Sequence, residues 1–256
     1  MIIDLEYKLR NVIRLFKSQI SKRYLRITLD RVVHDINDLK NYFTSRDFKK
    51  LSILDVGGGL GLFSIGLKIL NVHKSVIVDD FSELFNSNKE VKNIFKRFNV
   101  DCLKINLLSN DTIKLKKKYD VVTCFHTIEH FHHSPKKLLF RISKILKNKG
   151  LFILCAPNSN NIKKRIECFF GFYTWSNLND YFYSNTFRGH VREPNVSDLI
   201  FFTKYMKLKI VNIYGRNWQG LSSENRFIRI ITIIFDKFLR LFPSLCSDIY
   251  IVAKKI

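Results

Sequence analysis

Three side chains that can move a proton lie within five positions of this chain: His126, Glu129 and His130. They follow Tyr119–Phe125, an apolar run that is typical of a buried strand. At spacings of three and four residues, the three side chains would share one face of a helical turn. Because an imidazole titrates near neutral pH, His130, His126 and Glu129 are the candidates for acid–base catalysis.

A glycine-rich loop earlier in the chain points to a bound ligand. Residues 53–63 read Ile-Leu-Asp-Val-Gly-Gly-Gly-Leu-Gly-Leu-Phe, which is an apolar strand, a loop and the start of an apolar helix. Glycines let a ligand approach the backbone, where free N–H groups point at it. The dinucleotide pattern Gly-x-Gly-x-x-Gly fails, because Ser64 or Leu62 stands at its third glycine. The loop fits Asp-x-Gly-x-Gly-x-Gly instead, from Asp55 to Gly61.

The next predicted strand ends in two acids. The β-branched run 75–78 is followed by Asp79 and Asp80. A carboxylate at the end of a second strand can accept hydrogen bonds from both hydroxyls of a ribose. A helix is expected to follow, through Phe85.

Two motifs in the right order carry a resemblance to the class I S-adenosylmethionine-dependent methyltransferases. The first is the acid and glycine pattern at 55–61, and the second runs from Tyr-Asp-Val-Val through Glu-His-Phe to Pro-Asn over 119–158. The resemblance covers about residues 50–158. It implies an α/β, Rossmann-like, mostly parallel seven-stranded sheet of order 3-2-1-4-5-7-6, with strand 7 antiparallel. It also implies S-adenosyl-L-methionine as the cofactor.

The same resemblance implies which residues contact each part of the cofactor. It places the amino-acid end of the methyl donor on the glycine loop and the ribose on Asp79. Asn106 stands where many members have an Asp near the adenine, and its amide can still bond a base edge. The predicted cofactor-binding residues are Asp55, Gly57, Gly58, Gly59, Gly61, Asp79, Asp80, Asn106, Phe125 and His126.

Two other interpretations of the histidine cluster stay open. The run resembles the Glu-x-x-Glu-His metal site of ubiquinone-pathway and small-RNA methyltransferases, with His126 in place of the first Glu. A histidine there suits Mg²⁺ poorly, because that cation prefers oxygen ligands, and the predicted site contains no metal. Alternatively, Glu129 and His130 only cap and order the loop. His190, from a later Gly-His-Val-Arg-Glu-Pro segment, could join the cluster.

The length of 256 residues suits one domain with elaborations. We predict a helical N-terminal extension over 1–48 and a methyltransferase domain over 49–256. Inside the domain, we interpret the aromatic-rich stretch 159–195 as a lid or substrate-facing insertion. A helical insertion between strands 6 and 7 is expected over 215–246.

The formal net charge of +22 would attract nucleic acid, an anionic membrane or a polyanionic glycan. The basic residues are dispersed, however, which favours an ordinary solvated surface. The segment 226–242 has a basic stripe and a wide Ile and Phe arc. We expect a buried helix there, the alternative being contact with a membrane or a lipid-linked substrate.

The cysteines and the N-terminus favour a cytoplasmic protein. Association with the surface of a membrane is compatible with this expectation. The five cysteines are scattered and form no Cys-x-x-Cys pair, as expected of reduced thiols. The first residues lack the pattern of a signal peptide, and no 18-residue apolar run is present.

The leading functional prediction is methyl transfer from S-adenosylmethionine to an oxygen of a small molecule, a sugar or glycan, or a lipid-linked intermediate. An RNA methyltransferase is an alternative that rests on the charge, although no Asn-Pro-Pro-Tyr motif follows the fourth strand. A non-catalytic, membrane-docking scaffold with the same fold is a second alternative. The intact glycine loop and Asp79 argue against the scaffold.

Overall fold

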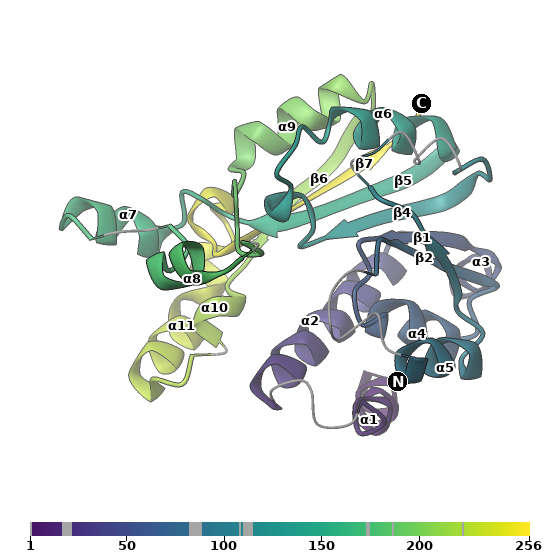
Figure 1. Cartoon of the computed structure of the whole chain (residues 1–256), viewed down its shortest axis with the longest axis horizontal. Helices are drawn as coiled ribbons and strands as arrows, with labels where there is room; N and C mark the ends of the chain where they lie inside the picture. The colour runs from purple at the N-terminus through teal and green to yellow at the C-terminus, as the bar shows by residue number, and fades with distance from the viewer. Residues whose placement is uncertain are drawn as a thin grey trace. The chain divides into compact units, whose positions relative to one another are not determined.

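The computed structural model describes residues 2–16, 22–81, 89–107, 109, 115–172, 175–185, 187–221 and 223–256 (Figure 1). Phe85, and with it the helix predicted there, lies outside these residues. None of the described helices is both long and apolar enough to cross a membrane.

Seven strands form one sheet with the order predicted from the sequence. They are β1 (Ser52–Val56), β2 (Lys74–Asp79), β3 (Asp101–Lys104), β4 (Tyr119–Phe125), β5 (Leu146–Pro157), β6 (Lys209–Arg216) and β7 (Asp248–Lys254). Across the sheet the order is β3-β2-β1-β4-β5-β7-β6. β1 pairs with β2, and β2 with β3, in parallel, whereas β7 runs antiparallel to β5 and to β6. This is the Rossmann-like arrangement with a reversed seventh strand.

The chain divides into two compact units, Met1–Thr123 with Ile145–Gly150, and Cys124–Lys144 with Leu151–Ile256. The helices of the first unit are α1 (Ile2–Ile13), α2 (Lys22–Lys40), α3 (Ser45–Lys50), α4 (Leu62–Ile69) and α5 (Lys89–Arg97). α1, α2 and α4 pack against one another. Leu9, Ile36 and Leu39 are fully buried, because their spacing puts them on the inner faces of the two amphipathic helices. A boundary at 48/49 stays a prediction.

The second unit carries the remaining helices. They are η2 (Ile128–His130), α6 (Lys136–Ile145), α7 (Ile162–Phe169), α8 (Leu178–Tyr183), α9 (Val196–Tyr205), α10 (Trp218–Leu221), α11 (Arg226–Leu239) and η3 (Pro243–Leu245). α9 begins with a capping box, in which the side chains of Asn195 and Asp198 each accept a hydrogen bond from the other residue's backbone N–H. β7 is buried from Asp248 to Ala253 and forms the centre of this unit.

The prediction that the helix over 226–242 is buried was wrong. Of the residues of α11, only Asp236 is buried. The helix is amphipathic as predicted, but the stripe that packs on the unit is the polar one. The sequence pattern of a helix shows that its two faces differ in polarity. It does not show which face packs against the rest of the protein.

Candidate active site

The glycine loop of the first unit has the backbone geometry of a ligand cradle. Gly59 has a φ of 51°, in the left-handed region, and a Cβ placed on it would meet no atom within 4 Å. Gly58 is confined instead, since a Cβ there would lie 2.7 Å from Oδ2 of Asp55. The loop is tied to the neighbouring strand, because the N–H of Gly57 donates to the carbonyl of Val78 (2.8 Å). One side of the loop is therefore packed, and the side at Gly59 is open.

Asp79 joins the end of β2 to this loop. Its Oδ2 accepts from the N–H of Gly59 (3.2 Å), and its Oδ1 accepts from the N–H of Phe81 (2.8 Å). Burial raises the pKa of Asp79 above its usual value, and the hydrogen bonds from these two N–H groups only partly offset that effect. The predicted ribose ligand thus lies beside the predicted amino-acid cradle. Asp80 and Asn106 are exposed just after β2 and β3.

Asp55 lies beneath the loop rather than on its open side. The carboxylate is buried and accepts from the hydroxyl of Thr123 (2.8 Å), with the Ser64 hydroxyl at 3.5 Å. Burial raises the pKa of Asp55 to about 7, and the nearby charge of Asp79 adds to this. Sequence reasoning missed the two hydroxyls. Ser64 had already been noticed as the residue that breaks the dinucleotide pattern, and Thr123 is a polar residue within an apolar strand.

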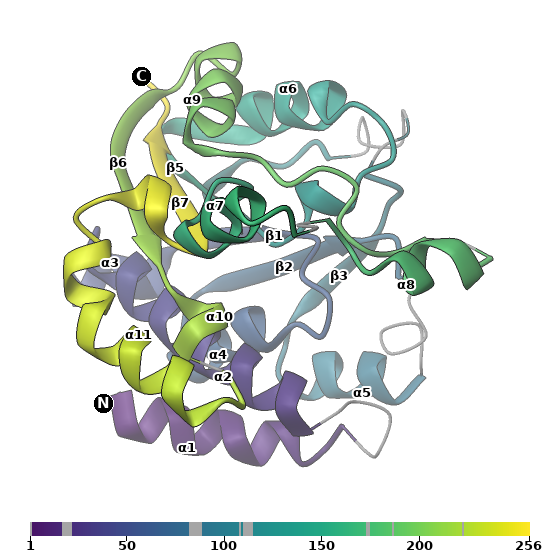
Figure 2. The ribbon, with the colours of Figure 1, turned by 90° about the vertical axis from the view of Figure 1, so that its left-hand side faces the viewer.

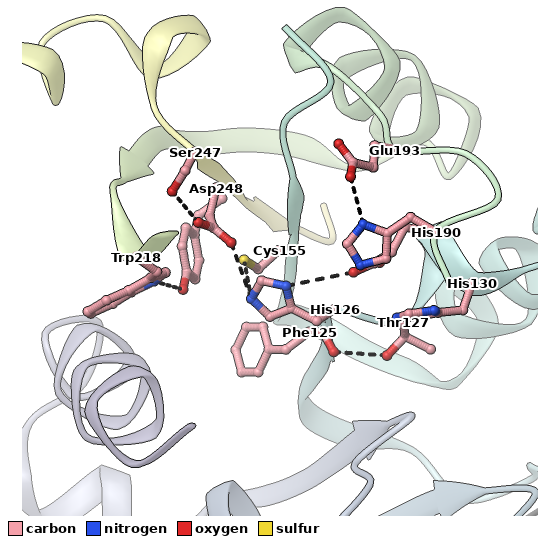
Figure 3. A network of polar contacts seen from close by, with 12 residues as sticks. Phe125, His126, Thr127, His130, Cys155, His190, Glu193, Trp218, Ser247 and Asp248 are labelled. Carbon is pink, nitrogen blue, oxygen red and sulfur yellow. Dashed lines mark hydrogen bonds and ion pairs between the residues drawn. The ribbon is translucent and has the colours of Figure 1, made fainter. Parts of the chain in front are cut away.

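The second unit holds the predicted catalytic side chains, of which His126 and His130 are labelled in Figure 3. Phe125 ends β4, and His126 follows with a φ of 48°, its N–H donating to the carbonyl of Cys155 (2.9 Å). This turn places the His126 ring between two buried carboxylates. Nδ1 lies 3.7 Å from Oε1 of Glu129, and Nε2 lies 3.7 Å from Oδ1 of Asp248. Sequence reasoning missed Asp248, which lies far away in the chain at the start of β7.

Glu129 is the most unusual of these residues. Its side chain is 0% exposed, yet neither carboxylate oxygen has a hydrogen-bond partner among the described residues. Burial on its own raises the pKa of Glu129, but the adjacent imidazoles of His126 and His130 outweigh it and hold the pKa below its usual value. Glu129 is therefore a buried negative charge that faces histidines.

His130 and His190 are both held through Nδ1. Nδ1 of His130 lies 3.0 Å from the carbonyl oxygen of Arg188, so this nitrogen carries the proton and donates it. Nδ1 of His190 lies 2.6 Å from Oε1 of Glu193, whose other oxygen pairs with Lys164. In both rings Nε2 is left to take a proton or bind a ligand. The two rings pack edge to face, with their centroids 4.9 Å apart.

Glu129, His130 and His190 also form a group that could hold a metal ion. One ligand atom from each lies within 4.8 Å of the others. A set of two imidazoles and one carboxylate suits a transition metal better than Mg²⁺. The expected trio of His126, Glu129 and His130 is thus divided: His190 joins Glu129 and His130, and His126 lies between Glu129 and Asp248.

A groove of about 510 Å³ reaches this cluster at His190. It is lined by Ser176, Asn177, Asp180, Ser184, Phe187, Arg188, Gly189 and His190. Its lining lies within the segment predicted as a lid, 159–195. Phe187 is an aromatic side chain of that segment that lines the groove, whereas exposed ones such as Phe169 and Phe182 do not.

Comparison with known proteins agrees with the geometry. A family model described as a methyltransferase domain matches residues 24–233. The chain belongs to the methyltransferase family. The magnesium protoporphyrin IX methyltransferase of Synechocystis PCC 6803, solved with bound SAH, has the same fold (TM-score 0.58, 11% identity, 95% of this chain and 92% of that one). So does a putative S-adenosylmethionine-dependent methyltransferase of Listeria monocytogenes (TM-score 0.56, 17% identity, 88% and 98%).

A curated relative of this methyltransferase is the ubiquinone biosynthesis O-methyltransferase of Rickettsia prowazekii (strain Madrid E). The two are 33% identical over 135 residues, which is 52% of this chain and 50% of the relative. The chain thus spans about half the length of the curated relatives it matches. The cofactor of the family is S-adenosyl-L-methionine, and an open glycine cradle beside an acid at the second strand fits it.

Proposed function

We propose that this methyltransferase transfers a methyl group to a hydroxyl oxygen of a small-molecule acceptor. S-adenosylmethionine supplies a methyl group already activated on a sulfonium. The chain's own residues then have two tasks, to orient the acceptor and to remove its proton. The observation that carries the proposal is Glu129, a buried carboxylate without a hydrogen-bond partner among the described residues. It lies near the rings of His130 and His190, whose Nδ1 atoms already have partners.

His130 is proposed as the group that accepts the acceptor's proton at Nε2. Its Nδ1–H is fixed by the backbone carbonyls of Arg188 and Gly189, which sets the tautomer. The negative charge of Glu129 stabilises the imidazolium that forms. No other proton carrier is needed, because the ring can pass its proton to water through the exposed side of His130.

The acceptor is proposed to lie in the groove that ends at His190. Hydroxyl, amide and carboxylate groups line it together with the ring of Phe187, a mixture that suits an aromatic or polyhydroxylated small molecule. Similarity to an O-methyltransferase supports oxygen, rather than nitrogen, as the atom methylated. A glycan or a lipid-linked intermediate fits the same groove chemistry only through its terminal hydroxyl-bearing group.

The test is His130→Ala, measured with catechol-type and sugar acceptors. Turnover should fall by about 100- to 10,000-fold, the usual contribution of one acid–base group. Calorimetric affinity for S-adenosylmethionine should stay near the wild-type value. His133→Ala is the matched control, because His133 is exposed on the same loop and lies outside the cluster. Unchanged turnover in His130→Ala would remove the ring from the mechanism, and absent cofactor binding in the wild type would favour the scaffold.

A metal-assisted version of the same reaction is the second candidate, and the convergence of Glu129, His130 and His190 favours it. A cation held by these three residues would lower the pKa of a bound hydroxyl. Chelation followed by titration with Zn²⁺, Mn²⁺ and Mg²⁺ separates the two versions. Loss of activity on chelation, with recovery by one cation, supports the metal, whereas activity that survives chelation supports the imidazole base.

A further inference from the structure

The polar stripe of α11 faces the protein, and its apolar arc faces outward. With the helix step of about 100°, Arg229, Thr232, Asp236 and Arg240 fall on one side, and these residues are buried or half-buried. Phe227, Ile234 and Phe238 lie at the centre of the opposite side, and they are 70%, 65% and 57% exposed. An ordinary surface helix shows the reverse arrangement.

Specific polar contacts fix this orientation of α11. The buried carboxylate of Asp236 accepts from the amide of Asn217 (2.9 Å) and pairs with Arg240 (2.5 Å). Thr232 packs so closely on α10 that a Cβ on Gly220 would lie 2.2 Å from its hydroxyl. The orientation is therefore fixed by hydrogen bonds and close packing. Rotation of the helix would break the hydrogen bond between Asn217 and Asp236 and leave the buried amide of Asn217 without this partner.

The exposed arc is wide and has a cationic edge. Its other exposed members are Ile228, Ile230, Ile231 and Phe235, followed after the helix by Leu241 and Phe242. Arg226 and Lys237 are exposed beside Ile230, at one margin of the arc. Large apolar side chains next to exposed basic groups are the composition of helices that lie in the interface of an anionic membrane.

We propose that α11 docks this protein on an anionic phospholipid bilayer, with its apolar arc in the acyl boundary and its basic margin at the headgroups. The net charge of +22 favours this occupant over a second copy of the chain, since two such copies repel each other. An acyl boundary accepts the Ile and Phe side chains, and anionic headgroups complement Arg226 and Lys237.

The aromatic helices of the same unit strengthen the assignment. α7, α8 and α11 lie at the left of Figure 1, and in Figure 2 they are spread across the side that faces the viewer, with α11 at the lower left and α8 at the right. Phe169 on α7, Phe182 on α8 and Trp175 between them are each more than two-thirds exposed. One consequence rests on the proposed function. Docking through these helices would bring the groove beside α8 to the bilayer, where it could take the terminal hydroxyl-bearing group of a lipid-linked acceptor.

Sedimentation of the full chain with vesicles tests the docking without any use of activity. The chain should sediment with vesicles of phosphatidylcholine and phosphatidylglycerol, and much less with phosphatidylcholine alone. Phe227→Asp combined with Ile234→Asp should weaken binding by at least about tenfold, because two charges would enter the acyl boundary. Phe201→Asp on α9, an equally exposed Phe in the same unit, is the control and should bind like the wild type.

A second pair of variants tests the contribution of Arg226 and Lys237 to membrane binding. Arg226→Glu with Lys237→Glu should weaken binding to anionic vesicles by at least about tenfold at low salt. Lys116→Glu with Lys117→Glu makes the same change in net charge on exposed residues far from α11 in the chain, and should have a much smaller effect.

Three results would overturn the docking. They are no sedimentation of the wild type with anionic vesicles, equal losses in the variants and their controls, and a wild-type dimer that Phe227→Asp and Ile234→Asp convert to monomer. The last would mean that a second copy covers the arc. Binding of S-adenosylmethionine by calorimetry is measured in every variant, so failure of docking and failure of the proposed function are separate results.

Discussion

Nδ1 of His190 lies 2.6 Å from Oε1 of Glu193, which fixes the ring so that Nε2 is directed away from this carboxylate. Burial by itself lowers the pKa of His190, but the hydrogen bond to Glu193 and the charge of Glu129 outweigh it, and the net direction is upward. Glu193 is thus a positioning residue that also sets the basicity of the ring.

Glu193→Gln should therefore lower the pKa of His190 and reduce kcat by about tenfold to a hundredfold, the usual cost of losing a group that orients a histidine. The titration of the His190 ring, followed by NMR, should shift to lower pH, because the negative charge of Glu193 that raises the pKa of His190 is gone. Glu167→Gln, in a partly exposed pair with Lys163, is the control. A lower kcat without any change in the pKa of His190 would indicate that Glu193 acts on structure alone.

Two adjacent glycines should respond differently to the same substitution. Gly58→Ala should reduce the free energy of unfolding by about 1–3 kcal/mol, because the new methyl group would press on the buried Asp55 carboxylate. Gly59→Ala adds a methyl group in open space and carries mainly the cost of its left-handed φ, about 1 kcal/mol.

The open side at Gly59 is where the cofactor is proposed to rest, so Gly59→Ala should weaken S-adenosylmethionine binding more than it lowers stability. Chemical denaturation and calorimetry of both variants measure the two effects. Equal loss of affinity and stability at Gly59 would mean that the methyl group perturbs the loop and does not fill a ligand site.

The resemblance carried by the two motifs predicted the strand order and the antiparallel seventh strand, because the fold that such motifs identify has one strand order. It also predicted the glycine cradle and the acid beside it, since parallel strands bring their carboxyl ends to one edge. Asp248 beside His126, and Glu193 beside His190, depend on side-chain packing that spacing does not encode. The outward apolar face of α11 was missed for a related reason: Asp236 finds its partner Asn217 only in the folded unit.

Asp79→Asn should weaken S-adenosylmethionine binding by about tenfold to a hundredfold, since hydrogen bonds to a charged acceptor contribute roughly 1.5–3 kcal/mol. The amide oxygen can still accept from Gly59 or Phe81, so the loop should keep its form. Calorimetry gives the affinity, and circular dichroism checks the fold. Asp80→Asn, at the exposed neighbouring acid, is the control, and a larger loss there than at Asp79 would reassign the ribose contact.

The raised pKa of Asp55 predicts that the free energy of unfolding depends on pH in an unusual way. Burial raises its pKa to about 7 in the folded protein from a usual value of 3.8. Between these values the folded state binds the proton and the unfolded state does not. The stabilisation is therefore fully present below pH 3.8 and is lost as the pH rises through 7. Within this window each pH unit changes the free energy of unfolding by up to about 1.4 kcal/mol.

Asp55→Asn removes the titrating group and keeps an oxygen that can accept from Thr123. Denaturation at pH 5 and pH 8 should therefore show a smaller loss of stability on raising the pH in this variant than in the wild type. Asp101→Asn, at an exposed side chain, should retain the wild-type difference. Because the charge of Asp79 contributes to the raised pKa, Asp79→Asn should move the wild-type dependence to lower pH. An identical pH dependence in Asp55→Asn and the wild type would show that Asp55 is ionised beneath the loop throughout this range.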